Sequence, residues 1–231
     1  FFMKKLIIFA CALALSFNVF AVITGSAHDF SAESWTISNR ICVACHVPHG
    51  ADTTVANAPL WSHDLTTAAF TAYGTGFDME LNVGQPSGVS LLCLSCHDGT
   101  MALDMLVFKP ATYDPLADTA MHMRLNASDD IESCGKCHNG DVAHNIGVKV
   151  LGTDLRNDHP ISMQYAGLGW KDPDFRPPPV PDELNNSQFN NGVKLYNGNV
   201  ECMTCHNVHD PSREVLLRAN AETLCFTCHL K

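Results

Sequence analysis

The sequence is poor in basic residues and, past its first twenty residues, in long apolar runs. It carries 14 Lys and Arg against 24 Asp and Glu, for a formal net charge of −10. Nucleic-acid binding depends on clusters of basic side chains, so this composition argues against it. A protein partner with a basic docking face is expected instead. After residue 20 no segment is long and apolar enough for a membrane span.

Long periodic patterns are also scarce. Gly, Pro, Asn, Asp, Ser and Thr are frequent throughout, which is typical of turns and loops. Extended helices or a large sheet are therefore not expected.

Cysteine, in contrast, is abundant and strictly arranged. The pattern Cys-x-x-Cys-His occurs five times and uses ten of the eleven cysteines. The five copies comprise Cys42, Cys45 and His46; Cys93, Cys96 and His97; Cys134, Cys137 and His138; Cys202, Cys205 and His206; Cys225, Cys228 and His229. The eleventh, Cys11, lies in the N-terminal apolar stretch.

This pattern attaches haem covalently. The two thiols bond to the haem vinyl groups, and the adjacent histidine supplies the proximal nitrogen to iron. A zinc site would need paired Cys-x-x-Cys units, and thioredoxin-like centres do not occur in fives with a trailing histidine. We therefore predict five covalently attached c-type haems.

Five haems in a chain of 231 residues determine the expected fold. Each haem is a large, flat, apolar body, so the core should consist largely of stacked haems. We predict a multihaem cytochrome c of mostly irregular loops, with short α-helices at the haem motifs and little or no β-structure.

The N-terminus has the features of a secretory signal. Lys4 and Lys5 precede the apolar stretch 6–20, which predicts a signal peptide over 1–21, with cleavage after residue 27 as an alternative. The remainder divides by its motifs, within one compact unit, into an N-terminal di-haem module (22–100), a single-haem insertion (101–150) and a C-terminal di-haem module (151–231). We expect an exported protein, extracellular or at the cell surface and otherwise periplasmic.

Seven of the twelve histidines lie outside the motifs. Five bis-histidine haems need five of them as distal ligands. The candidates, in order of preference, are His49, His209, His159, His63, His28 and His144. His122 competes with His144 for the third haem. Methionines such as Met79 and Met163 are rival ligands, but the histidines are in excess.

Two candidates are placed so that they cannot serve their own motif. His49 and His209 each follow a proximal histidine by three residues, and two linking residues cannot wrap round a porphyrin. Each must therefore point at a neighbouring haem and hold two porphyrins against each other. We predict His49 as a ligand of the second haem and His209 of the fifth.

The motifs also resemble a known family. The stretch 202–229 looks like the doubled Cys-x-x-Cys-His motif of multihaem cytochromes. Further marks resemble the branch that includes extracellular cytochromes similar to those that polymerise into haem nanowires. They are His28-Asp-Phe-Ser31, Ile41-Cys-Val-Ala-Cys-His-Val-Pro-His49, Pro59-Leu-Trp-Ser-His63, Leu92-Cys-Leu-Ser-Cys-His-Asp-Gly-Thr100, Gly152-Thr-Asp-Leu-Arg-Asn-Asp-His-Pro160 and Val200-Glu-Cys-Met-Thr-Cys-His206. The chain departs from that branch at 101–150, where the third motif looks like an added haem.

Three functions compete on this basis. The leading prediction is an electron-transfer protein that forms an extracellular conductive filament with copies of itself. One distal ligand, His28 on the N-terminal arm, would then be donated to a neighbouring subunit. The alternative is a soluble periplasmic shuttle that passes electrons to a partner reductase. A reductase enzyme ranks last, because all five motifs end in histidine and none marks an open iron.

Overall fold

The computed structural model describes residues 23–33, 35–37, 40–74, 83–101, 103, 105–108, 111, 150–165, 173–182 and 185–230. The signal segment 1–21, the third motif, His122 and His144 lie outside the described residues. What the sequence predicts for them, and the division into modules, stays a prediction.

The described helices are short and coincide with haem motifs. Helix α2 (Ser90–His97) contains the whole second motif, and α4 (Cys202–Cys205) contains the cysteines of the fourth. Helix α5 (Ala221–Leu224) leads into the 3₁₀ turn η3 (Cys225–Thr227) of the fifth motif. The first motif is only a turn, in which the His46 N–H donates to the Cys42 carbonyl at 2.7 Å. Among the described residues, no helix is long and apolar enough to cross a membrane.

The strands are shorter still. Strand β1 (Met163–Gln164) pairs antiparallel with β4 (Asn199–Val200), and β2 (Ser187–Gln188) with β3 (Lys194–Leu195). The turn between β3 and β4 is Asn197-Gly198, with φ of 51° and 76°. An Asn-Gly pair with both φ values positive forms the tight type I′ hairpin turn. That turn directs the chain through β4 into α4 and the fourth motif.

The apolar residues form several small clusters rather than one core. One joins Val55, Val89 and Leu92 of the N-terminal part to Tyr196, which follows β3. A second surrounds Leu94 of α2, and a third packs Tyr165 on Leu195 and Val200.

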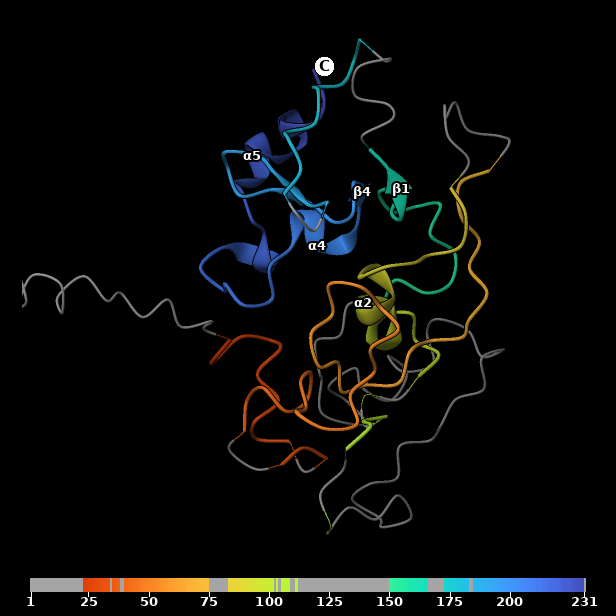
Figure 1. Cartoon of the computed structure of the whole chain (residues 1–231), viewed down its shortest axis with the longest axis vertical. Coiled ribbons are helices and arrows are strands. Elements are labelled where there is room, and N and C mark those ends of the chain that lie inside the picture. The colour runs from red at the N-terminus through yellow and green to blue at the C-terminus, as the bar shows by residue number, and fades with distance from the viewer. Residues whose placement is uncertain are drawn as a thin grey trace, which may run out of the picture.

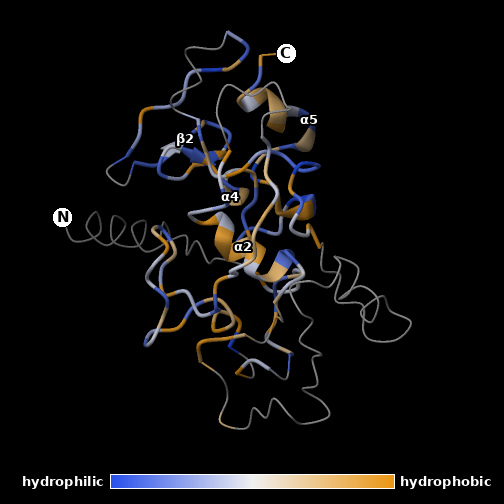
Figure 2. Ribbon diagram, turned by 90° about the vertical axis from the view of Figure 1, so that its right-hand side faces the viewer, coloured by the Kyte–Doolittle hydropathy of each residue, from blue (hydrophilic) through white to orange (hydrophobic). Residues whose placement is uncertain are grey.

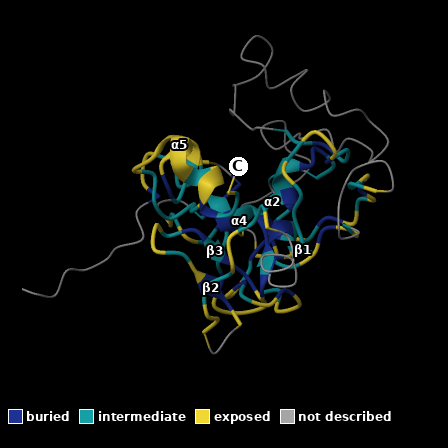
Figure 3. Cartoon of the chain, turned by 90° about the horizontal axis from the view of Figure 1, so that it is seen from above, coloured by how far each residue is buried: buried dark blue, intermediate teal, exposed yellow. Residues whose placement is uncertain are grey.

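Figure 1 shows α2 between the N-terminal loops below and the C-terminal strands and helices above. Figure 2 shows that α2 is largely apolar, and Figure 3 shows buried residues along α2 and an exposed α5.

Over the residues that it describes, the structure confirms the expectation of a mostly irregular chain with short helices and little β-structure. The stretch 213–228, which leads into the fifth motif, does not form a single helix. This stretch is instead broken into η2 (Glu214–Leu216), α5 and η3. Val215 and Leu216 have positive φ values of 47° and 59°, which no α-helix permits. The break turns the Val215 carbonyl toward His206, where it accepts a hydrogen bond.

Candidate haem-binding site

Two of the predicted proximal histidines, His46 and His206, are held by backbone carbonyls. Nδ1 of His46 lies 2.7 Å from the Pro59 carbonyl, and Nδ1 of His206 lies 2.9 Å from that of Val215. A carbonyl can only accept, so Nδ1 carries the proton and Nε2 is left with its lone pair. This arrangement fixes the tautomer and orientation of a metal-binding imidazole.

The two segments that supply these carbonyls repeat the same backbone contacts. Val47 N–H donates to Leu60 at 2.8 Å, and Asn207 N–H donates to Leu216 at 2.7 Å. On the other side of each motif, Ser62 and Arg218 donate to the carbonyls of the second cysteines, Cys45 and Cys205, at 3.0 and 2.8 Å. The first and fourth motifs are therefore built alike, each braced by a strand-like return of the chain.

Three distal candidates lie opposite proximal histidines. The ring centres are 6.1 Å apart for His209 and His46, 6.1 Å for His28 and His97, and 6.4 Å for His159 and His229. The angles between ring planes are 17°, 46° and 72°.

These separations fit an iron between two imidazoles. Metal–imidazole bonds of about 2 Å, with a ring centre about 1 Å behind each nitrogen, place the ring centres roughly 6 Å apart. The angle between the planes can vary, because each ring can turn about its bond to the metal. Three of the predicted proximal histidines thus have a distal partner at suitable spacing within the same chain.

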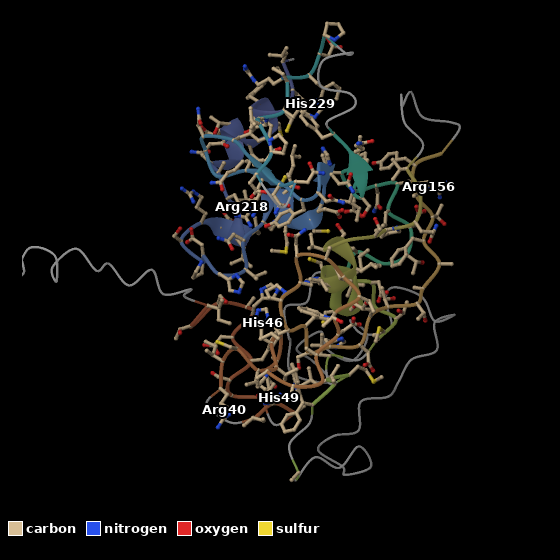
Figure 4. The ribbon with its side chains drawn as sticks, viewed as in Figure 1. Arg40, His46, His49, Arg156, Arg218 and His229 are labelled. Atoms are coloured by element: carbon tan, nitrogen blue, oxygen red, sulfur yellow. The ribbon has the colours of Figure 1, made fainter. Side chains whose placement is uncertain are left out.

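The pairs differ from two pairings that the sequence predicts. His209 lies opposite His46 of the first motif, with nearly parallel ring planes, rather than opposite the fifth motif, where His159 lies instead. His28 lies opposite the second motif, where His49 is expected from sequence. Figure 4 shows His46 between the N-terminal loops and the C-terminal elements, with His49 farther out among those loops. His49 is exposed.

The surroundings of two of these rings, His28 and His209, favour the neutral form by lowering the pKa. Burial, followed by the nearby His97 and His206, lowers the pKa of His28. Burial, followed by His46 and Arg218, lowers the pKa of His209. The neutral imidazole is the form that ligates a metal.

Two further ring nitrogens are buried without a hydrogen-bond partner: Nδ1 of His28 and Nε2 of His63. Such a nitrogen is costly unless a ligand satisfies it. Nδ1 of His63 lies 2.7 Å from the Asp64 carbonyl, so Nε2 again carries the lone pair. His63 lines an apolar cavity with Trp61, Cys45 and Cys96, where both cysteines belong to haem motifs. These residues fit a haem by their chemistry.

Three motif cysteines have environments unlike that of a reactive thiolate, whereas the neighbouring Cys93 thiol lowers the pKa of Cys202. Burial, then the charge of Cys42, raises the pKa of Cys45 to about 11. Burial also raises the pKa of Cys96 to about 12 and that of Cys205 to about 11. Disulfide oxidoreductases need a lowered thiol pKa, and these thiols have the opposite.

Two buried carboxyl groups lie next to haem motifs and were not predicted from the sequence. Asp98, directly after His97, is 1% exposed and accepts hydrogen bonds from Thr66 Oγ1 at 2.5 Å and Thr100 N at 2.7 Å. Glu201, directly before Cys202, is 2% exposed and accepts from Ser90 and, at 3.1 Å, from Ser162. The Asp-Gly-Thr after the second motif signals a local turn, but nothing in the sequence signals the long-range partners of Glu201.

One comparison with known proteins bears on this site. A family model described as the doubled CXXCH motif matches residues 196–231, which run from the end of β3 through the fourth and fifth motifs. No curated protein sequence matches the chain. The matched motif supports a multihaem c-type cytochrome, a class of protein that binds haem covalently and transfers electrons.

Proposed function

We propose that this protein is a pentahaem c-type cytochrome that carries electrons along a series of bis-histidine haems. The observation that carries the proposal is the set of three histidine pairs, whose ring centres lie 6.1, 6.1 and 6.4 Å apart. Each pair joins a Cys-x-x-Cys-His histidine to one from a distant part of the chain.

Specific ligands follow for three haems. His46 and His209 would hold the first iron, His97 and His28 the second, and His229 and His159 the fifth. His138 and His206 supply the proximal ligands of the third and fourth haems. Their distal ligands come from the remaining candidates, which are His63, His49 and His144, with His122 as the rival of His144.

The role of the chain is to hold and insulate these groups. Haem supplies the one-electron chemistry when bound. The cysteines fix each porphyrin edge, and the carbonyls of Pro59 and Val215 orient the proximal rings. Two histidine ligands per iron leave no open position, so the ligand set favours electron transfer over catalysis at iron.

We further propose that the protein assembles with copies of itself into an extracellular filament. The sequence places the cross-subunit ligand at His28, but the ring of His28 lies beside His97 of its own chain. The exposed His49 is the better donor to a neighbouring copy, because it lies on the surface. The next residue, Gly50, lies close to the exposed side chain of Val107. The alternative is an exported, unassembled shuttle that passes electrons to a reductase.

The first test addresses the haems. The purified protein should contain five haems by the pyridine haemochrome assay, and its oxidised form should give the low-spin spectra of bis-histidine iron. His209→Ala should convert one haem to a high-spin form. Arg213→Ala, a change in the same exposed loop, should leave all five low-spin. Fewer than five haems, or a spectrum unchanged in His209→Ala, would contradict the proposal.

The second test addresses assembly. Haem-staining material sheared from producing cells should appear as thin filaments by electron microscopy. His49→Ala should abolish the filaments, whereas His28→Ala should alter the second haem of each subunit. Discrete particles from the unmodified protein would instead favour the shuttle.

A further inference from the structure

We infer that the haem of the fourth motif is the branch point of the electron path, in direct contact with the haems of the first, second and fifth motifs. The inference rests on the proposed function, because it requires haem at each motif. It departs from a relay in chain order, in which the fourth haem would contact only the third and the fifth.

The contact with the second haem is made through two helices. Helices α2 and α4, which carry the second and fourth motifs, pack against each other. The Cys202 N–H donates to Ser90 Oγ at 3.0 Å, and the thiols of Cys93 and Cys202 lie close enough for each to shift the pKa of the other. Each sulfur becomes a thioether on the edge of its porphyrin. Adjacent sulfurs therefore bring the edges of the second and fourth haems together.

The contact with the first haem is made through a histidine. His209 follows the proximal His206 of the fourth motif by three residues, yet its ring lies opposite that of His46 of the first motif, 6.1 Å away. With His209 on the first iron and His206 on the fourth, two linking residues separate ligands of different haems. So short a link holds the first and fourth porphyrins against each other.

The contact with the fifth haem is expected because the segment between the fourth motif and α5 folds back onto the fourth motif. Arg218 donates from its backbone to the Cys205 carbonyl at 2.8 Å, and α5 begins only three residues later. Helix α5 leads directly into the fifth motif. The thiols of Cys228 and Cys225 are close enough to Cys205 for their charges to raise its pKa further, after burial.

The test uses the complete haem-loaded protein and two-dimensional exchange NMR through a redox titration. Haem methyl signals, assigned through contacts with the bonded cysteines, report the oxidation of each haem separately. Oxidation of the fourth haem should raise the midpoint potentials of the first, second and fifth, because adjacent positive charges interact most strongly. Oxidation of the fifth should act chiefly on the fourth.

A matched pair of variants isolates one contact. Ser90→Ala removes the hydroxyl that joins α2 to Cys202, and should weaken the interaction between the second and fourth haems alone. Ser95→Ala is the same change in the same helix, but its hydroxyl bonds to Leu91 and Thr66 and should leave that interaction intact.

The outcomes separate the two proposals. A haem count below five would contradict the proposed function. Five haems whose strongest interactions run in chain order, with the fourth insensitive to the first and second, would overturn the branch point alone.

Discussion

At the scale of single residues, the most unusual group outside the haem ligands is the Glu201 carboxyl. It lies between α2 and α4, 2% exposed, and accepts hydrogen bonds from Ser90 and Ser162. Burial raises its pKa above the ordinary value of 4.5, although the hydrogen bonds from Ser90 and Ser162 oppose that shift. The charged form is thus less stable in the folded protein than in the unfolded chain.

The sign of the pH effect follows. An acid whose pKa rises on folding contributes most stability while it is protonated, below its unfolded pKa. That contribution is lost as the pH rises from about 4.5 through the raised folded value. In the unmodified protein, the guanidinium midpoint of unfolding should therefore fall as the pH rises above about 4.5. In Glu201→Gln, measured on the haem-loaded protein, this fall should be smaller. Glu33→Gln, at an exposed position, should keep the original slope.

Truncation at the same site should act differently. Glu201→Ala leaves the buried hydroxyl of Ser90 without its acceptor, at a cost of about 1–3 kcal/mol in the free energy of unfolding. If Gln and Ala lower the midpoint equally at pH 7, the acceptor oxygen that Gln retains contributes nothing to stability, which would contradict the assigned hydrogen bonds.

At the scale of elements, the Asn197-Gly198 turn between β3 and β4 positions the fourth motif. Gly198 has a φ of 76°, in the left-handed region that disfavours residues with a Cβ atom. Gly198→Ala should reduce the free energy of unfolding by about 1–2 kcal/mol, the usual cost of that backbone conformation.

The matched control is Gly74→Ala. Gly74 has an ordinary φ, and no atom lies within 4 Å of a Cβ placed there. Thermal unfolding, followed by circular dichroism, should show a lower midpoint for Gly198→Ala only. Equal midpoints for both variants would mean that the turn does not determine how the fourth motif is held.

The elements also show what sequence alone could predict. The cysteine pattern located the helices of the second and fourth motifs, since attachment to haem requires a local turn of backbone. It could not predict the break at Val215 and Leu216, because the hydrogen bond that compensates it comes from His206, nine residues away. The sequence could likewise not predict the pairs of His209 with His46 and of His28 with His97. They depend on how the two halves of the chain pack, and histidine spacing carries no information about that packing.

At the scale of the whole molecule, the acidic charge should control encounters with redox partners. The formal net charge is −10. Opposite charges steer diffusing proteins together and raise association rates 10- to 1,000-fold at low ionic strength. Salt screens this attraction over about 10 Å at 0.1 M.

A small basic cytochrome makes a suitable electron acceptor for testing this effect. Its second-order rate of reduction by the fully reduced protein, followed by stopped flow, should fall at least roughly tenfold between low and high salt. An acidic acceptor of similar potential should show the reverse trend, because salt then screens a repulsion. A rate that is independent of salt for both acceptors would mean that electrons leave through a neutral patch. The exit would then have to be sought among the exposed apolar residues near the fifth motif, such as Phe226 and Leu230.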